Sequence, residues 1–153
     1  MGGNVSIIEH GIGLHDILVN TRKLNGKKIN VGVLRTAGRS ADGKTDLVDI
    51  AMWNEFGTAR IPKRPFMRIA EEKHGKEWQK LATDLADKVD MGEMNEEQLY
   101  EIVGNKMVGD IQEVIGNRNQ LQANAPATVR RKKSDAPLID TGQLRQAISF
   151  EVR

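Results

Sequence analysis

Residues 65–89, PFMRIAEEKHGKEWQKLATDLADKV, decide the fold because they form the longest stretch with apolar residues at helical spacing. Pro65 suits the first position of a helix, where a fixed φ angle and a missing N–H are tolerated. The apolar residues that recur every three or four positions are Phe66, Ile69, Ala70, Trp78, Leu81, Ala82, Leu85 and Val89. We therefore predict one long amphipathic helix from Pro65 to about Val89.

A second long helix is predicted from Asn95 to about Ile115. Asn95 and Gln98 have the spacing of a capping box, in which each side chain bonds the other residue's backbone N–H. The residues expected to face inward are Leu99, Ile102, Val103, Met107, Ile111 and Val114. Gly104 and Gly109 each cost a helix about 1 kcal/mol relative to alanine, so we expect close packing against them.

Two strands are expected beside these helices. Residues Lys28–Leu34 alternate Ile29, Val31 and Val33 with smaller or polar residues, which is typical of a half-buried strand. Residues Ile148–Val152 show the same period of two and follow a predicted helical turn at Gln143–Ala147. These strands indicate a small sheet.

Two shorter helices complete the predicted fold. The spacing of apolar residues favours an N-terminal helix at Leu14–Leu24, ended by Asn25-Gly26. Asp46–Phe56 carries a narrow apolar stripe and Thr45 as a possible cap, although a strand is also compatible with these residues. The predicted fold class is thus α+β: a small antiparallel sheet packed against two long helices and an N-terminal helix.

The length of 153 residues suits one domain with a modest core, so we expect residues 1–153 to form a single domain. Exposed loops are expected at about residues 35–45 and 117–136, where small, polar and glycine residues gather. No apolar run approaches the roughly 20 residues of a membrane span, and no cleavable signal is evident at the N-terminus. We expect no membrane association.

Charge and residue types restrict the chemistry. The absence of cysteine excludes disulfides, thiolate metal sites and cysteine nucleophiles. His10, His15 and His74 lack partners at ligand spacing, and no serine has the context of a nucleophile. We therefore expect no metal, no cofactor and no enzymatic activity.

The charge is unevenly distributed along the chain. The net charge is +5 over residues 1–76, −7 over residues 77–117 and +4 over residues 118–153. Opposite charges can therefore pair within the chain or between neighbouring copies.

The most distinctive residues lie in two segments. The first reads AMWNEFGT at 51–58 and continues after two residues as IPKRPFMR at 61–68. The second reads PLIDTGQL at 137–144 and is followed by ISF at 148–150. In this order, the segments resemble the neck and tail-completion proteins of long-tailed bacteriophages, in which EFGT, IPxRPF and LxDTGxL motifs recur with helices between them. The resemblance covers about residues 45–72 and 98–153.

The resemblance implies a structural virion protein of the head-to-tail neck. It implies a homo-oligomeric ring, sixfold in the family, that joins the head connector or adaptor to the tail terminator or tail tube. DNA would pass through its lumen, where non-specific contact is possible. Such a protein is assembled in the cytoplasm of the host bacterium and is located in the virion. A tail terminator that caps the tail tube fits the same residues and stays open as an alternative.

The motif residues are interpreted as turns and as a subunit interface. Gly57, Asp140, Thr141 and Gly142 suit turns and caps, and Phe56 and Phe66 are expected to anchor the proline-stiffened connector to the core. Arginine pairs well with a neighbour's carboxylates. The candidate interface residues are Glu55, Phe56, Arg60, Pro62, Lys63, Arg64, Pro65, Phe66 and Arg68. An ordinary solvated loop would also explain them.

A basic run at Arg130, Arg131, Lys132 and Lys133 has two interpretations. It could contact DNA through phosphates, with strong salt dependence and no sequence preference, or it could be a solvated or interface loop. No aromatic residue interleaves it, so base stacking is not expected. A small non-specific nucleic-acid-binding protein is therefore a further alternative function. A nuclease finds no support, because no constellation of carboxylates and histidines is evident.

Overall fold

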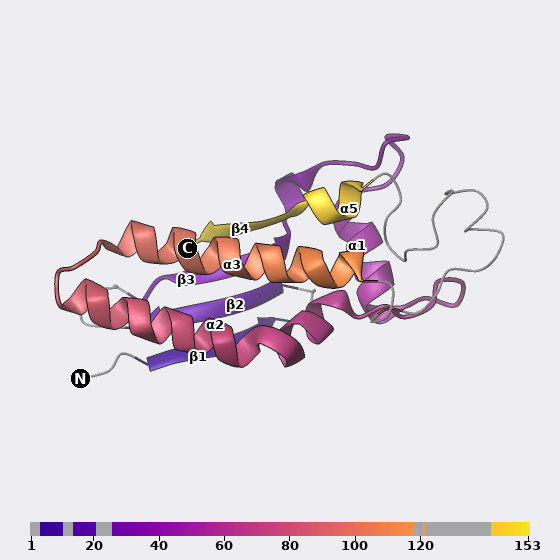
Figure 1. Ribbon diagram of the computed structural model, residues 1–153. Helices are drawn as coiled ribbons and strands as arrows, with labels where there is room; N and C mark the ends of the chain where they lie inside the picture. Colours follow the sequence, from indigo (N-terminus) through magenta and orange to yellow (C-terminus); the bar gives the residue numbers. More distant parts are fainter. Residues whose placement is uncertain (1–3, 11–13, 21–25, 118–120, 122–141) are drawn as a thin grey trace.

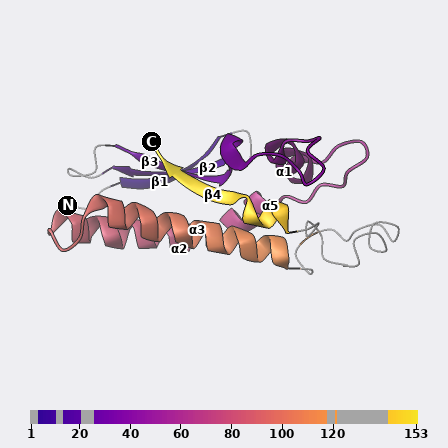
Figure 2. The same cartoon turned by 90° about the horizontal axis from the view of Figure 1, so that it is seen from above.

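The computed structural model describes residues 4–10, 14–20, 26–117, 121 and 142–153. These residues form two layers, a sheet and a pair of long antiparallel helices that cover one face of it (Figures 1 and 2). The predicted α+β class is confirmed. Of the two expected loops, residues 35–45 are mostly exposed and begin with a short 3₁₀ helix, η1 (Arg35–Ala37). The loop expected at 117–136 lies almost entirely outside the described residues.

The sheet has four antiparallel strands in the order β1-β2-β3-β4. They are β1 (Asn4–His10), β2 (Leu14–Asn20), β3 (Lys28–Val33) and β4 (Ile148–Val152). Ile29 lies opposite Val152, and Val33 opposite Ile148. The sheet therefore joins the end of the described chain to its first third, and β3 and β4 are strands as predicted. The expectation that β3 is half-buried is wrong, because Asn30 and Gly32 are buried as well as Ile29, Val31 and Val33.

The predicted N-terminal helix at Leu14–Leu24 is wrong. Residues 14–20 form strand β2, which pairs with β1 from Asn4↔Asn20 to His10↔Leu14. Leu14, Ile17 and Leu18 satisfy a helical spacing, but a run of seven residues is too short for periodicity to separate a helix from a strand. Pairing with strands on both sides then satisfies the backbone of β2, which outweighs the weak local preference for helix.

The two long helices are α2 (Phe66–Asp90) and α3 (Glu96–Gly116), and both were predicted within a few residues. α2 packs against α3, β1 and β2, and α3 packs against β3 and β4. The largest fully buried side chains are Trp78, Phe66, Ile29, Met67, Leu99, Met107, Ile111 and Ile115. Burial of these side chains between the sheet and the helices is the main stabilising contribution, at roughly 25 cal/mol per Å² of apolar surface.

The capping box of α3 is confirmed in detail. The Asn95 side chain accepts the backbone N–H of Gln98 at 2.9 Å, and the Gln98 side chain accepts that of Asn95 at 3.0 Å. Gly104 lies against the Phe150 ring, where an added Cβ would be 2.5 Å from a ring carbon, whereas Gly109 faces open space. The prediction that Ile102 faces inward is wrong, because its side chain is 44% exposed.

Two small helices lie at one end of the long pair (Figure 1). They are α1 (Leu47–Phe56) and α5 (Gln143–Gln146). The helical interpretation of residues 46–56 is thus confirmed, although the N-cap is Asp46 and not Thr45. α1 contacts α2, α5 and β3, so this end brings the first motif beside the described part of the second, residues 142–144.

Candidate functional site

The first motif builds the connection between α1 and α2, residues 53–68, which we call the α1–α2 corner. Glu55 lies in the last turn of α1 and is buried. Its carboxylate accepts the backbone N–H groups of Met67 at 2.9 Å and Arg68 at 3.2 Å. These are N–H groups of the first turn of α2, which have no partner within the helix and carry the positive end of its dipole. The N-cap residue Pro65 makes no side-chain cap, so Glu55 supplies it from another helix.

Asn54 and Arg64 join the two sides of the corner. The Asn54 amide donates to the Ile50 carbonyl at 2.8 Å, and its oxygen accepts from the Arg64 guanidinium at 3.2 Å. The backbone N–H of Arg64 donates to the Asn54 carbonyl at 2.6 Å. Arg64 is buried, and this burial lowers the pKa of its guanidinium from the ordinary value. Arg64 therefore holds the corner together from within.

The turn after α1 is equally constrained. Gly57 has a φ of 75°, and a Cβ there would lie 3.2 Å from the backbone nitrogen of Lys63. Only glycine adopts this conformation at low cost. The Thr58 hydroxyl oxygen accepts the N–H groups of Arg60 at 3.2 Å and Ile61 at 2.9 Å. The EFGT segment is thus a closed turn, as expected for Gly57.

The corner leaves aromatic and basic side chains on its outside. Trp53 is 41% exposed and Phe56 is 48% exposed. Phe66 is an anchor in the core, as expected, but the expectation that Phe56 is one is wrong. Between Ile50 and Ala70 the exposed ionic side chains are Arg60, Lys63 and Arg68, and all are basic. We call the set of five outward side chains the aromatic–basic end; its members are Trp53, Phe56, Arg60, Lys63 and Arg68.

The structure thus divides the predicted interface residues into three groups by burial. Glu55, Arg64 and Phe66 are buried and bond or pack within the chain. Pro62 and Pro65 are half-buried, while Phe56, Arg60, Lys63 and Arg68 are exposed. Trp53 was not predicted to be exposed. Its position one turn before Phe56 on a short helix was the available signal, because residues three apart share a face.

The second motif is described only from Gly142 onward. Gly142 adopts a left-handed conformation with φ of 74° before α5, which agrees with the predicted turn. The Gln143 side chain accepts the backbone N–H of Ala41 at 2.8 Å, which ties α5 to the exposed loop after η1. Asp140 and Thr141, together with the basic run Arg130, Arg131, Lys132 and Lys133, lie outside the described residues.

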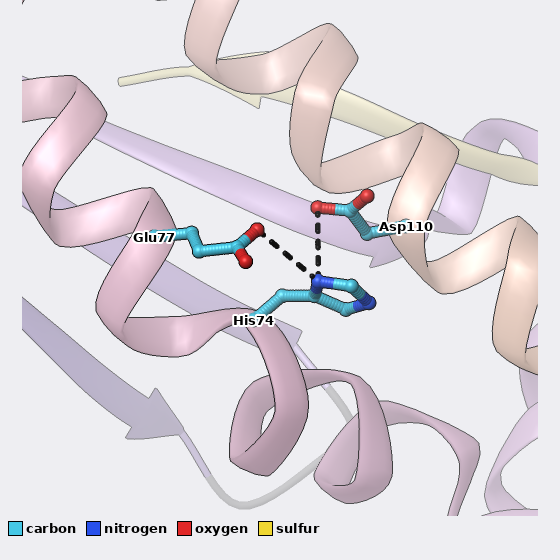
Figure 3. Close-up of side chains that lie close together, drawn as sticks. All are labelled: His74, Glu77 and Asp110. Carbon is cyan, nitrogen blue, oxygen red and sulfur yellow. Dashed lines mark hydrogen bonds and ion pairs between the residues drawn. The ribbon is translucent and has the colours of Figure 1, made fainter.

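A polar cluster between α2 and α3 was not predicted (Figure 3). His74, Trp78 and Asp110 are buried in it, whereas Glu77 and Lys106 are exposed. The Trp78 indole N–H donates to Asp110 at 2.7 Å, and the Lys106 ammonium donates to the same carboxylate at 2.7 and 2.8 Å. His74 Nδ1 lies 3.4 Å from a Glu77 oxygen and 3.8 Å from Asp110. The hydrogen bond to Asp110 raises the pKa of Lys106. The Lys106–Asp110 spacing of four was visible in the sequence, but its link to Trp78 was not.

The cluster places three metal-ligating side chains near one another. The ligand atoms of His74, Glu77 and Asp110 all lie within 4.8 Å of one another. The Asp110 carboxylate, however, already accepts from Trp78 and Lys106, and Lys106 brings the positive charge that a cation would supply. We therefore interpret this cluster as a bond between the two long helices.

A pocket between α1, β3 and the start of α2 has a volume of about 10 Å³. That is about the space one water molecule needs. It is lined by Val33, Val48, Ala51, Met52, Glu55, Phe66 and Met67. The pocket is therefore a packing gap beside the Glu55 cap and is too small for an organic substrate.

In comparisons with protein-family models, curated proteins and solved structures, nothing matches this chain. None of the helices in the described ranges combines the length and apolar character needed to cross a membrane. The motifs and the geometry of the α1–α2 corner are therefore the features that bear on function.

Proposed function

We propose that the protein is a structural component of a tailed-bacteriophage virion that forms a ring in the head-to-tail neck. The observation that supports this proposal is that buried and exposed residues of the α1–α2 corner have different roles. Buried polar groups, led by Glu55, fix the shape of the corner from inside. The same corner presents Trp53 and Phe56 to the outside, together with basic side chains. Such a surface suits docking better than chemistry.

The composition of this surface supports a role in protein association. Tryptophan and arginine are over-represented among the residues that dominate binding energy at interfaces. An apolar centre with a charged surround is also the usual arrangement of interfaces. Trp53 and Phe56 are two of the six aromatic residues in the chain, and both are exposed. We infer that other protein surfaces cover them in the assembled particle.

The proposed mechanism is geometric. A corner braced by Glu55 and Gly57 would present its outer side chains in one fixed arrangement, which limits the entropy lost on docking. Copies that meet through two different surfaces close into a ring when the rotation between them allows it. The ring would then join the head connector to the tail, with DNA in its lumen. A tail terminator also needs a ring, and differs only in its neighbours.

Deletion of the gene from the phage or prophage that encodes this chain tests the proposal. For a neck protein we expect lysates with filled heads and tails of normal length that remain separate in electron micrographs. Complementation with the wild-type chain should restore joined particles. Unjoined tails of excessive length would instead indicate a terminator, and normal infectious particles without the chain would contradict both structural roles.

A further inference from the structure

The surfaces at the two ends of the long helix pair have opposite charge. α2 has 25 residues, which corresponds to about 37 Å at 1.5 Å per residue. The aromatic–basic end lies where α1 meets the start of α2, and the connection between α2 and α3 lies at the other end (Figures 1 and 2). The molecule is elongated along this direction, so one copy can meet two neighbours at well-separated surfaces.

The far end is acidic and also exposes apolar side chains. Met91 is 72% exposed and Ile102 is 44% exposed. Between Val89 and Asn105 the sequence has no lysine or arginine. Glu93, Glu97 and Glu101 are exposed, while Glu96 pairs with Lys27 at 3.0 Å. Lys88, in the last turn of α2, and Lys106, in the middle of α3, are the basic residues on either side of this segment, and both are exposed. We call the following set the acidic end: Met91, Glu93, Glu97, Glu101 and Ile102.

We propose that the aromatic–basic end of one copy docks on the acidic end of a second copy. This proposal rests on the proposed ring and specifies the contact that would form it. Each end offers two exposed apolar side chains beside three exposed charges of one sign. Contact between two identical ends would oppose like charges, whereas contact between unlike ends pairs arginine and lysine with glutamate. The complementarity therefore selects a head-to-tail contact.

The geometry of this contact has a consequence for assembly. A contact between two different surfaces leaves one free copy of each surface at the ends of any open chain. A second subunit therefore adds in the same orientation as the first, and closure or continued growth is set by the rotation per subunit. Trp53 and Phe56 would lie against Met91 and Ile102, with the charged side chains around them. The contact would cover Ile102, an exposed apolar side chain among the exposed polar residues Gln98 and Asn105 of α3.

Cysteine cross-linking tests the contact directly, because the chain has no native cysteine. Ala59→Cys marks the aromatic–basic end and Lys88→Cys, in the last turn of α2, marks the acidic end; both positions are exposed and outside the proposed patches. When the two single variants are mixed under mild oxidation, we expect disulfide-linked heterodimers at least about fivefold faster than homodimers of either. Gln79→Cys, exposed in the middle of α2, is the matched control. Equal rates for all pairs would overturn the proposal.

Charge reversal identifies the pairing. Arg60→Glu with Lys63→Glu in the Ala59→Cys chain should reduce cross-linking to the Lys88→Cys chain severalfold. Glu97→Lys with Glu101→Lys in the Lys88→Cys chain should reduce cross-linking to the Ala59→Cys chain by a similar factor. Combining both reversed chains should restore the rate, because acidic again meets basic. All four substitutions are at exposed positions, and circular dichroism of each variant checks that it is folded. A reversed pair that fails to recover would contradict the contact.

These outcomes separate the contact from the proposed function. Loss of head–tail joining on deletion of the gene, without selective cross-linking, would leave a neck protein that assembles through other surfaces. Selective cross-linking with recovery on charge reversal, but normal particles without the chain, would leave a head-to-tail oligomer with another role. The two proposals therefore fail in different experiments.

Discussion

The α1–α2 corner and the α2–α3 hairpin (Phe66–Gly116) each contain a buried carboxylate that accepts hydrogen bonds, and the two carboxylates bind different groups. Glu55 accepts backbone N–H groups at the start of a helix, so it fixes where α2 begins. Asp110 accepts the side chains of Trp78 and Lys106, so it fixes how two helices pack. One carboxylate shapes a surface for docking and the other stabilises the scaffold behind it.

This difference predicts that mutations in the hairpin act on stability and that mutations on the corner's outer face act on assembly. The expected effects on the free energy of unfolding decrease from Asp110 to Glu55. Urea or thermal denaturation measures this free energy for each variant, and complementation of a gene deletion measures assembly.

The largest effect is expected for Asp110→Ala. The substitution leaves the buried Trp78 N–H without its acceptor and removes the partner of Lys106. We expect a loss of about 3 kcal/mol in the free energy of unfolding. Asp110→Asn retains an oxygen for Trp78 and should lose clearly less. Equal losses for the two variants would show that the charge, and not the indole hydrogen bond, matters.

Tyr100 should make the hairpin sensitive to alkaline pH. Burial raises the pKa of its hydroxyl to about 12, with a further contribution from Glu96. Because the folded state holds this proton more tightly than the unfolded chain, the contribution is complete below pH 10 and is lost as pH rises from 10 to 12. We expect a loss of about 2 kcal/mol by pH 12. In Tyr100→Phe this part of the alkaline loss should disappear, and an unchanged pH profile would contradict the assignment.

Gly104→Ala should destabilise the contact between α3 and β4. An added Cβ would lie 2.5 Å from the Phe150 ring, so the ring or the helix must move. We expect a net loss of about 1.5 kcal/mol, because overpacking outweighs the better helix propensity of alanine. Gly109→Ala is the matched control, since nothing lies within 4 Å of its added Cβ. That variant should gain stability, and destabilisation of both would argue against the packing explanation.

Glu55→Gln tests the corner itself. Removing the charge weakens both hydrogen bonds to the first turn of α2 and the interaction with its dipole. We expect a loss of about 1 kcal/mol. Glu72→Gln changes the same charge at an exposed position of α2 and should have little effect. If both substitutions had the same effect, general electrostatics would explain it.

The sequence predicts an element correctly where its apolar pattern is long or its hydrogen bonds are local. It fails where a residue's partner lies far away along the chain. The two long helices follow from periodic stretches of more than 20 residues, and the Asn95–Gln98 box closes within four residues. β2 was misassigned because its pairing with β1 and β3 decides the conformation of a short apolar run. Glu55 was assigned to an interface because its partners, Met67 and Arg68, lie 12 and 13 residues away.

The surface residues were predictable only in part. Arg60, Lys63 and Arg68 follow from the charge of the proline-stiffened segment, and the structure places them outside as expected. Ile102 has the spacing of a core residue, and only the position of the sheet relative to α3 reveals that it is exposed. The Trp78–Asp110 bond links positions 32 apart, which spacing within a single helix does not reveal.

Trp53→Ala with Phe56→Ala should affect assembly more than stability. More than half of the surface of each residue is covered within the chain, so we expect a loss on the order of 1–2 kcal/mol in the free energy of unfolding, with the variant still folded. The double variant should fail to complement a deletion of the gene in head–tail joining. Lys76→Ala with Gln79→Ala, at exposed positions of α2, is the control and should complement. Full complementation by both variants would show that assembly does not need the aromatic side chains.

A cryo-electron microscopy reconstruction of the intact particle at the junction of head and tail tests the central claim most directly. We predict a ring of this chain in which the Trp53 and Phe56 side chains of each copy lie against the α2–α3 connection of the next. A junction that contains no density for this chain would contradict the account.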